Sequence, residues 1–413
     1  RYKVTGQKIY ITYGEHDLTD NIVHMVLART PDAPAGVKGI SLFIVPKYLP
    51  KPDGTVGERN DLRVASIENK LGIHASPTCV MAYGDNGGAI GYLVGEECRG
   101  IEYMFTMMNN ARLGVGLQGV AIAERALQQA RAYAHERTQG RDPSGKGGDA
   151  PAAIIRHPDV RRMLMTMRAQ TEAVRALAYY AAAALDGARR EPDAERRAAT
   201  QARVDLLIPV VKSWSTDVGV EVASIGVQIH GGMGFVEETG AAQHYRDARI
   251  APIYEGTNGI QALDLFGRKL MRDRGEAMRA LIAEMRALDS DLANGRGDDL
   301  AVIREGLAKG IDVLETATER LIALAREDMA AAAAGASYYL RLTGTVVGAW
   351  LLAKGALAAL RHMETGDGDP AFLEAKLVTA RFFAEHILPT GTALLAPIES
   401  GGRSVMALAD DQI

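Results

Sequence analysis

One carboxylate stands in a sequence context that suits acid–base chemistry. Glu255 lies within Tyr254–Thr257, a Tyr-Glu-Gly-Thr segment that predicts a loop opening a helix. Apolar Ile253 and Ile260 flank this segment. A carboxylate in a desolvated pocket has a raised pKa, which is what a general base acting near neutral pH needs. An acid at a helix start is more often only a favourable cap, and that interpretation would prevail if the motif stood alone.

Two Gly-rich segments interrupt sequence that is otherwise helical in pattern. Residues 140–148 favour a flexible connector between helices. The second segment, Gly231–Gly234, is framed by Gln228 and Phe235, and glycine there lets the backbone approach a ligand closely. The same stretch also fits a plain connector, so the sequence leaves both interpretations open.

The elements that must position these residues fall into three regions, so the expected fold class is a multidomain α+β protein. From 1 to 105, β-branched and aromatic runs alternate with turn residues, which predicts a barrel-like β domain. From 106 to 272, helical periodicity predicts an antiparallel four-helix bundle that carries the base. From 275 to 413, a further helical pattern predicts an additional all-α domain. The expected strands are 8–12, 22–28, 40–45 and 79–83, and the expected bundle helices are 112–137, 157–188, 193–225 and 257–272.

Length and composition exclude several classes of protein. A chain of 413 residues exceeds one usual core, and its 47% apolar and 24% charged residues are typical of a globular protein. The net charge of -4 gives no basic field for nucleic acid. Cys79 and Cys98 lack the spacing of a metal site or a disulfide scaffold, which favours a reducing cytoplasm. No signal peptide or membrane-spanning run is expected. The start at Arg1, inside a strand-like pattern, leads us to expect a missing front end.

Several short motifs together resemble the acyl-CoA dehydrogenase family from residue 1 to about 272. Each motif is weak alone, but their order and spacing are similar to those of the family. They are Gly6–Thr12, Gly39–Pro46, Ala111–Gly116, Tyr133–Arg137, Gln228–Phe235 and Ile253–Thr257. Beyond them, Lys376–Pro389 resembles the extra C-terminal domain of a bacterial subgroup that includes 3-methylmercaptopropionyl-CoA dehydrogenases. The family's N-terminal helical domain is expected to be missing from this chain.

The resemblance implies a reaction. Glu255 matches the family's catalytic base, which removes a proton from the carbon next to the thioester of an acyl-CoA. The backbone N–H of Glu255 and a ribityl hydroxyl of FAD are expected to stabilise the thioester oxygen as it gains charge. The β hydrogen leaves as a hydride to the flavin. The expected product is therefore a trans-2-enoyl-CoA, as in the β-oxidation of fatty acids.

The same resemblance assigns binding residues by their place in the motifs. Some have simpler interpretations: Ile11 fits a half-buried strand, Arg137 a favourable helix C-terminal charge, and Arg112 a solvated first-turn residue. Gly259 stands where many members carry Gln. The expected FAD-binding residues are Tyr10, Ile11, Thr12, Thr257 and Gly259, with Arg137, Gln139, Gln228, Gly231 and Gly232 reaching the FAD of a neighbouring subunit; the expected substrate-binding residues are Arg112, Tyr254 and Gly256.

The resemblance also implies partners. They are FAD, an electron-transfer flavoprotein as electron acceptor, and further copies of the chain in a homodimer or homotetramer. Two alternatives stay open: an acyl-CoA oxidase, which passes electrons to oxygen, and a non-catalytic structural homologue without FAD.

The C-terminal region is expected to pack on the bundle or form subunit contacts through apolar faces at 346–352 and 377–383. It is expected to have no direct role in proton or hydride transfer.

Overall fold

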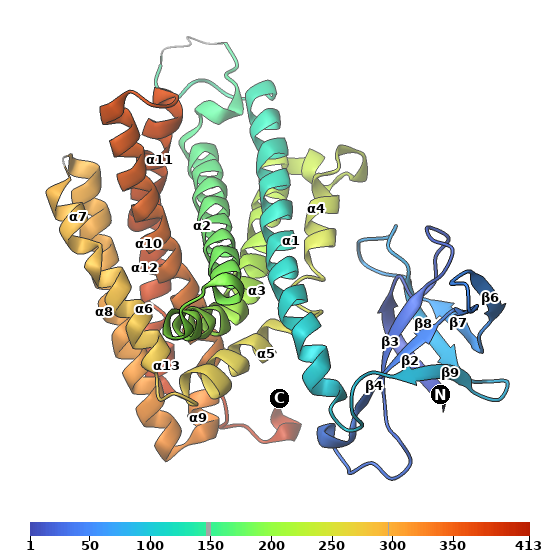
Figure 1. Cartoon of the computed structure of the whole chain (residues 1–413). Coiled ribbons are helices and arrows are strands. Elements are labelled where there is room, and N and C mark those ends of the chain that lie inside the picture. The colour runs from blue at the N-terminus through green and yellow to red at the C-terminus, as the bar shows by residue number, and fades with distance from the viewer. Residues whose placement is uncertain (146–149, 296) are drawn as a thin grey trace. The chain divides into compact units, whose positions relative to one another are not determined.

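The chain divides into two compact units in the computed structural model, Arg1–Ala111 and Arg112–Ile413 (Figure 1). The structure describes residues 1–145, 150–295 and 297–413. Each unit has a hydrophobic core of its own. Of the first Gly-rich segment, residues 146–148 lie outside the described residues.

The first unit is built from short antiparallel strands. A four-stranded sheet has the order β1-β9-β4-β3, a three-stranded sheet has the order β2-β8-β7, and β5 pairs with β6. All four predicted strands are present, as β2, β3, β4 and β8. The strands are Tyr2–Val4 (β1), Gly6–Thr12 (β2), Val23–Ala28 (β3), Ser41–Pro46 (β4), Tyr48–Pro50 (β5), Val56–Arg59 (β6), Leu62–Ile67 (β7), Thr78–Tyr83 (β8) and Ala89–Leu93 (β9).

Both larger sheets contribute to one apolar core. Phe43 and Val45 of β4 are buried with Cys79 and Met81 of β8, so the sheets share an inner layer. The pairing among the described strands leaves β1 and β3 as edges of one sheet and β2 and β7 as edges of the other. The strands therefore form separate sheets, and the predicted barrel-like closure is not confirmed. The predicted end of the β domain at residue 105 falls inside helix α1, which begins at Gly100.

Three long helices form the centre of the second unit. They are α1 (Gly100–Glu136), α2 (Pro158–Arg190) and α3 (Ala194–His230), close to three of the predicted helices. Asp193 caps α3 by accepting a hydrogen bond from the Arg196 N–H at 2.8 Å. Glycines let α1 approach α3, because a Cβ built at Gly116 would lie only 2.6 Å from Val211 Cγ1. The two helices are thus held at short range.

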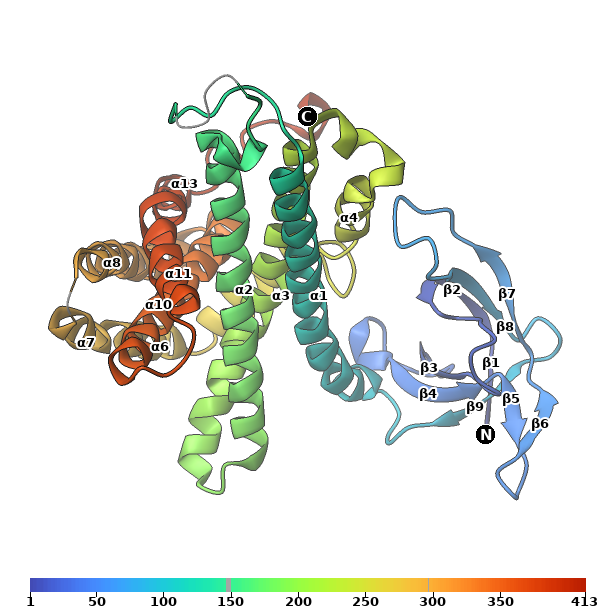
Figure 2. The same ribbon diagram turned by 90° about the horizontal axis from the view of Figure 1, so that it is seen from above.

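The predicted fourth bundle helix, 257–272, is present as a continuous helical segment, but it is short and changes type along its length. It consists of α5 (Asn258–Leu263) and a π-helical segment, η5 (Asp264–Leu270). The long helix that packs beside α2 and α3 is instead α10 (Ala336–Thr365), from the C-terminal region. Viewed from above, α10 and α11 (Pro370–Phe382) lie against α2 (Figure 2).

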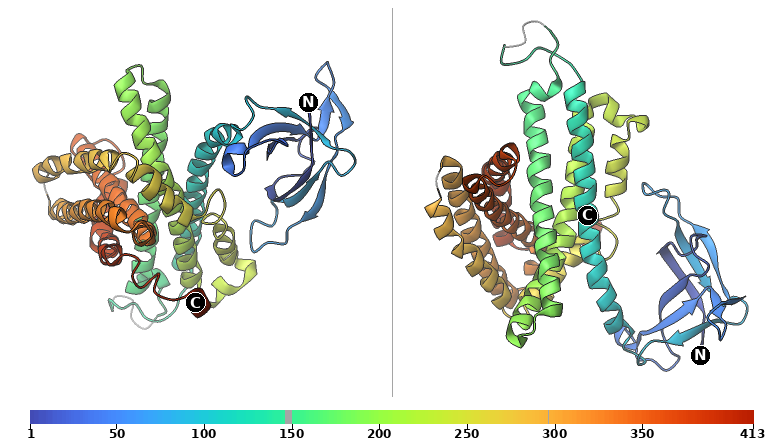
Figure 3. Two further views of the ribbon diagram at one scale, coloured as in Figure 1. Left: turned by 90° about the horizontal axis from the view of Figure 1, so that it is seen from below. Right: turned by 45° about the horizontal axis from the view of Figure 1, so that its top comes forward.

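Helix α10 is the central helix of the C-terminal region. By length and composition alone this helix could cross a membrane, although no membrane-spanning run was expected from the sequence. However, 83% of its most apolar window is buried inside the protein. It packs against α2, α3, α5 and α8 (Asp298–Glu327), and Figure 3 shows α8 on its outer side. Burial against these helices accounts for its apolar composition, as expected for a core helix.

A tryptophan joins α10 to the bundle. Trp214 of α3 is 4% exposed and lies over Gly344 and Gly348 of α10. A Cβ at Gly344 would be 2.6 Å from Trp214 Cγ, and one at Gly348 would be 2.5 Å from Trp214 Cη2. Only glycine at these two positions lets the indole ring fit against the helix.

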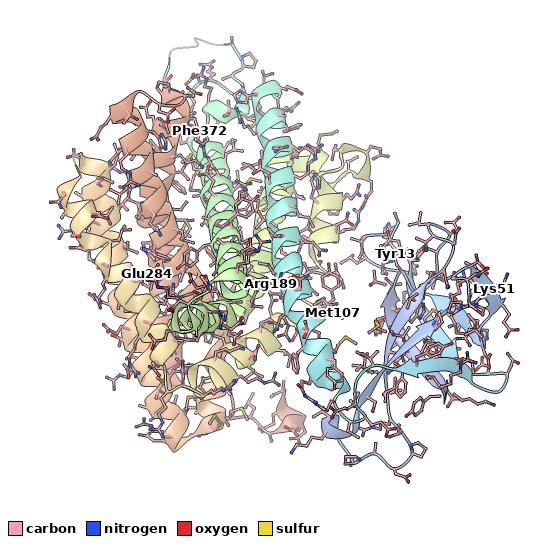
Figure 4. The ribbon with its side chains drawn as sticks, in the orientation of Figure 1. Tyr13, Lys51, Met107, Arg189, Glu284 and Phe372 are labelled. Carbon is pink, nitrogen blue, oxygen red and sulfur yellow. The ribbon has the colours of Figure 1, made fainter. Side chains whose placement is uncertain are left out.

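A polar contact ties the C-terminal region to the bundle at a second place. Glu284 of α6 (Glu276–Ala287), labelled in Figure 4, accepts hydrogen bonds from Tyr180 of α2 at 3.1 Å and from Arg203 of α3 at 2.6 Å. Residues on both sides of the predicted 272–275 boundary thus share one core, and that boundary stays a prediction about the chain's organisation. The remaining helices are α4 (Ala241–Ala248), α7 (Asp289–Asn294), α9 (Met329–Ala334), α12 (Leu388–Thr392) and α13 (Leu395–Ser400).

Candidate active site

Glu255 lies in a tight turn between α4 and α5. Its backbone has φ 55°, and the next residue, Gly256, has φ 85°. Two successive residues in the left-handed region make a sharp bend, and this region is unfavourable for a residue with a Cβ such as Glu. The Glu255 side chain is exposed. The bend therefore places a carboxylate at the surface of the helical unit.

The turn is held by hydrogen bonds from the helix that follows it. Thr257 caps α5, because its Oγ1 accepts a hydrogen bond from the Ile260 N–H at 3.3 Å. Gln261 is fully buried, and its amide donates to the carbonyl oxygens of Glu255 at 3.4 Å and Gly256 at 3.3 Å. Both carbonyls of the bend thus have fixed partners.

A buried polar cluster on α3 lies beneath the turn. Lys212 is 0% exposed, and its Nζ donates to the Gly256 carbonyl at 2.8 Å and to Asn258 Oδ1 at 2.9 Å. The Asn258 amide donates to Asp217 Oδ1 at 2.7 Å. Burial lowers the pKa of Lys212 to about 8, partly opposed by the negative charges of Asp217 and Glu255. Burial also raises the pKa of Asp217.

Arg112 occupies a different environment from the one the sequence predicts. Because α1 begins at Gly100, Arg112 lies in the middle of a helix and not in a first turn. It is 5% exposed, so the solvated interpretation is wrong. Its Nη1 lies 3.5 Å from Asp264 Oδ2, and its Nη2 is 3.8 Å from the point where a Cβ on Gly256 would stand. Its contact with CoA stays a prediction.

Tyr254 is fixed by a contact within the helical unit. Its hydroxyl donates to Gln118 Oε1 of α1. Burial raises the pKa of the Tyr254 hydroxyl. The apolar residues that flank the turn are more exposed than Tyr254: Ile253 is 48% and Ile260 is 50% exposed. Among the described residues of this unit, these apolar side chains leave Glu255 exposed, and a desolvated pocket around it stays a prediction.

A second group of predicted residues lines one groove of ≈ 580 Å³. Arg137 and Gln139 come from the segment after α1, and Gly231 and Gly232 come from the turn that ends α3. Arg137 Nη2 donates to Gln139 Oε1 at 3.1 Å. Nothing lies within 4 Å of a Cβ built at either glycine, so the backbone of the turn is open to the groove. Gln228 is exposed one turn before and does not line the groove.

Tyr10, Ile11 and Thr12 form the end of β2 in the first unit. The β2–β8 register shifts between Lys8 and Ile11, and Tyr10 has φ 56° at this irregularity. Tyr10 is 69% exposed, whereas Ile11 packs against the core of the sheets. The half-buried strand predicted for Ile11 is confirmed. The bulge turns Tyr10 and Thr12 outward, where they are free to contact a ligand.

The residues present suit FAD. The groove offers the Arg137 guanidinium and an open glycine backbone, which match the charge and shape of the nucleotide part of such a cofactor. Within the same unit, Thr257 caps α5 with its hydroxyl. In the first unit, taken by itself, the end of β2 exposes Tyr10 and Thr12. The roles of these residues toward FAD, and that of exposed Gly259, stay predictions.

Several residues of the site escaped prediction from sequence. Lys212, Asp217, Asn258 and Gln261 form most of the buried contacts beneath Glu255. The sequence held one signal for Lys212: this charged residue directly follows Leu206–Val211, a run without charged residues. A lone charge in an apolar helical run is buried with a partner or reaches solvent along its stem, and sequence alone does not say which.

Two family models match successive parts of the chain. Residues 98–271 match the acyl-CoA dehydrogenase C-terminal domain, and residues 276–409 match a model described as acetyl-CoA dehydrogenase C-terminal like. The two matches meet close to the predicted boundary at 272–275. Both the base-bearing region and the extra C-terminal region are thus similar to known domains.

Curated and solved relatives agree with these models. The chain is 51% identical to 3-methylmercaptopropionyl-CoA dehydrogenase of Ruegeria pomeroyi over 98% of its own length and 68% of the relative. It is 37% identical to a broad-specificity linear acyl-CoA dehydrogenase of Mycobacterium tuberculosis, with 98% and 69% covered. An acyl-CoA dehydrogenase from Bacillus anthracis, solved with FAD, has the same fold with a TM-score of 0.71 at 21% identity, covering 100% of this chain and 65% of that one.

The chain therefore spans about two thirds of these relatives. The identity to the Ruegeria pomeroyi enzyme confirms the resemblance read from the motifs, including the bacterial subgroup with the extra C-terminal region. The predicted enzyme class and its FAD cofactor are confirmed at the level of the family. By these matches the chain belongs to the acyl-CoA dehydrogenase family.

Proposed function

We propose that the protein oxidises the CoA thioester of a carboxylic acid to the trans-2-enoyl-CoA, and that Glu255 removes the α proton. One observation carries this proposal: an exposed carboxylate stands on a left-handed turn whose carbonyls are held by buried side chains, in a member of the acyl-CoA dehydrogenase family. A base fixed in this way needs no rearrangement to reach a bound substrate.

The turn also offers a donor for the thioester oxygen. Among the hydrogen bonds of the described residues, the Glu255 N–H has no acceptor. An N–H that points at the oxygen on which negative charge develops stabilises the transition state for removal of the α proton. Base and donor then belong to one residue, so both are positioned by the same bend.

Substrate binding is expected to supply the cover that Glu255 lacks in the free helical unit. Ile253 and Ile260 expose about half of their surface beside it. An acyl chain against these side chains would exclude water from the carboxylate. Loss of water destabilises the anion, so the carboxylate becomes a stronger proton acceptor. FAD, when bound, supplies the acceptor for the β hydrogen and its electron pair.

The acyl group and the electron acceptor are further parts of the proposal. Relatives act on 3-methylmercaptopropionyl-CoA and on linear acyl-CoAs, so a panel of both, assayed with an artificial electron acceptor, tests the substrate. An electron-transfer flavoprotein is the proposed physiological acceptor. An acyl-CoA oxidase would instead produce peroxide under air in proportion to the substrate consumed. Peroxide at that yield would contradict the proposed acceptor and identify an oxidase.

The groove at Arg137 gives a testable role in holding the cofactor. We expect Arg137→Ala to weaken FAD retention, because the groove loses its cation for an anionic ligand. If the FAD belongs to a neighbouring subunit, the homodimer or homotetramer should weaken with it by linkage. Flavin absorbance at about 450 nm after gel filtration measures FAD retention. Sedimentation of the same sample measures the oligomeric state.

Arg131→Ala is a matched control for the groove variant. Arg131 is an exposed arginine of α1, the helix that ends just before Arg137, but it does not line this groove. The control should keep its FAD and its oligomeric state. A monomer of Arg137→Ala that still holds FAD as tightly as the wild type would contradict the assignment. A wild-type protein that never binds flavin would instead favour the non-catalytic homologue.

A further inference from the structure

Lys212 is a charged residue in a place where burial is costly. It is 0% exposed on α3, next to the buried residues Val210 and Val211. A cation removed from water is tolerated only where fixed polar groups surround it. Its Nζ has such partners, the Gly256 carbonyl at 2.8 Å and Asn258 Oδ1 at 2.9 Å. Both partners belong to the segment that carries Glu255.

The backbone of that segment is in an unfavourable conformation. Glu255 has φ 55°, a region that residues with a Cβ adopt only when their surroundings hold them there. The Lys212 bond to the next carbonyl fixes the bend from below, and the Gln261 amide reaches the same carbonyl at 3.3 Å. Without Lys212 the Gly256 carbonyl keeps only the longer of these two bonds.

Other charges nearby help to hold Lys212 in place. Asp217 of the same helix binds the Asn258 amide at 2.7 Å, which turns Asn258 Oδ1 toward the ammonium. Glu255 on the turn and Arg112 on α1 also act on Lys212, with opposite signs. Although burial lowers the Lys212 pKa to about 8, the group is mostly protonated at neutral pH and makes charge-assisted bonds.

We propose that Lys212 is a positioning residue for the reaction, which holds the Glu255 turn in its active conformation by binding the Gly256 carbonyl. This inference rests on the proposed role of Glu255. Lys212 does not itself reach the substrate, since it is enclosed by α3 and the turn. Its contribution is to keep the carboxylate and the Glu255 N–H aimed at the same thioester.

The test is Lys212→Met, which keeps an unbranched side chain as far as Cε and removes the ammonium. In the FAD-loaded enzyme we expect kcat to fall about ten- to a hundredfold, because a small misplacement of a reacting group is costly. KM for acyl-CoA and FAD content should stay near wild-type values. Amide hydrogen exchange should become faster at residues 255–258, a readout that does not depend on activity.

Thr318→Val is the control for loss of a buried polar contact elsewhere in the unit. Thr318 is 0% exposed and bonds to the Tyr339 hydroxyl at 2.8 Å, far from the turn in sequence. It should lower thermal stability without changing kcat or exchange at 255–258. If Lys212→Met does not fold, Lys212→Gln replaces it, with a shorter uncharged donor and the same expected changes.

A folded, FAD-loaded variant with wild-type kcat and wild-type exchange at 255–258 would overturn the positioning role. This failure is separable from failure of the base assignment. If Glu255→Gln keeps activity, the base is wrong whatever Lys212 does. If Glu255→Gln is inactive and the Lys212 variant is normal, only the positioning role is wrong.

Discussion

Glu255→Gln should lower kcat by about 10²–10⁴-fold, the usual contribution of a positioned general base. The amide keeps the shape of the carboxylate but cannot accept the α proton. Because the turn is held through its backbone and through Thr257, Gln261 and Lys212, its conformation should survive the change. FAD content and affinity for CoA thioesters should therefore stay near wild-type values, measured by flavin absorbance and equilibrium binding.

Glu276→Gln serves as the matched control. Glu276 is another exposed carboxylate of the same unit, in the first turn of α6, away from the base turn in sequence. Its amide variant should turn over like the wild type. If Glu255→Gln instead stayed within about tenfold of wild type, only about 1.4 kcal/mol of the barrier would be affected. Another group would then have to be the base.

Trp214→Ala should lower the free energy of unfolding by about 3–5 kcal/mol, as expected when a large buried aromatic side chain leaves a cavity. The indole is 4% exposed and fills the space above Gly344 and Gly348 of α10. Its loss separates α10 from α3, the two helices that meet behind the base turn. Denaturant unfolding at fixed FAD concentration measures the effect.

Gly355→Ala is the control on the same helix. Nothing lies within 4 Å of a Cβ at Gly355, which is exposed, so alanine should be neutral or raise the free energy of unfolding by about 0.5–1 kcal/mol. A loss below about 1 kcal/mol for Trp214→Ala would match an ordinary surface substitution. The contact between α3 and α10 would then contribute little to the fold.

The packing of α10 adds a contact that the sequence did not predict. The C-terminal region is predicted to pack on the bundle, and α10 does pack against α2 and α3. It also packs against α5, the helix that starts directly after the base turn. Removing residues after 275 should therefore expose the core around Trp214, release one side of α5 and lower stability. That this region has no direct role in proton or hydride transfer stays a prediction.

Local patterns in the sequence were enough for the elements that carry the motifs. Periodicity located α1, α2 and α3, and β-branched runs located β2, β3, β4 and β8, because each depends on neighbouring residues. The residues Arg137 and Gly231 are 94 positions apart and were singled out by separate motifs, and the structure brings both to one groove.

Contacts between distant elements were beyond the sequence. Lys212 lies 44 residues before Gly256, and no spacing rule pairs a helix interior with a turn so far along the chain. The solvated first-turn interpretation of Arg112 was wrong because α1 begins at Gly100, where its backbone packs against Ile40 and Ser41 of the first unit. The exposed state of Glu255 depends on how Ile253 and Ile260 are oriented, which a pattern of apolar residues does not reveal.

The central claim is that Glu255 removes the α proton, and proton exchange tests it most directly. A CoA thioester without a transferable β hydrogen is incubated with the FAD-loaded enzyme in D₂O, and deuterium at its α carbon is measured by mass spectrometry. The wild type should exchange the α hydrogen, whereas Glu255→Gln should bind the thioester with similar affinity and not exchange it. Exchange by Glu255→Gln at the wild-type rate would contradict the account.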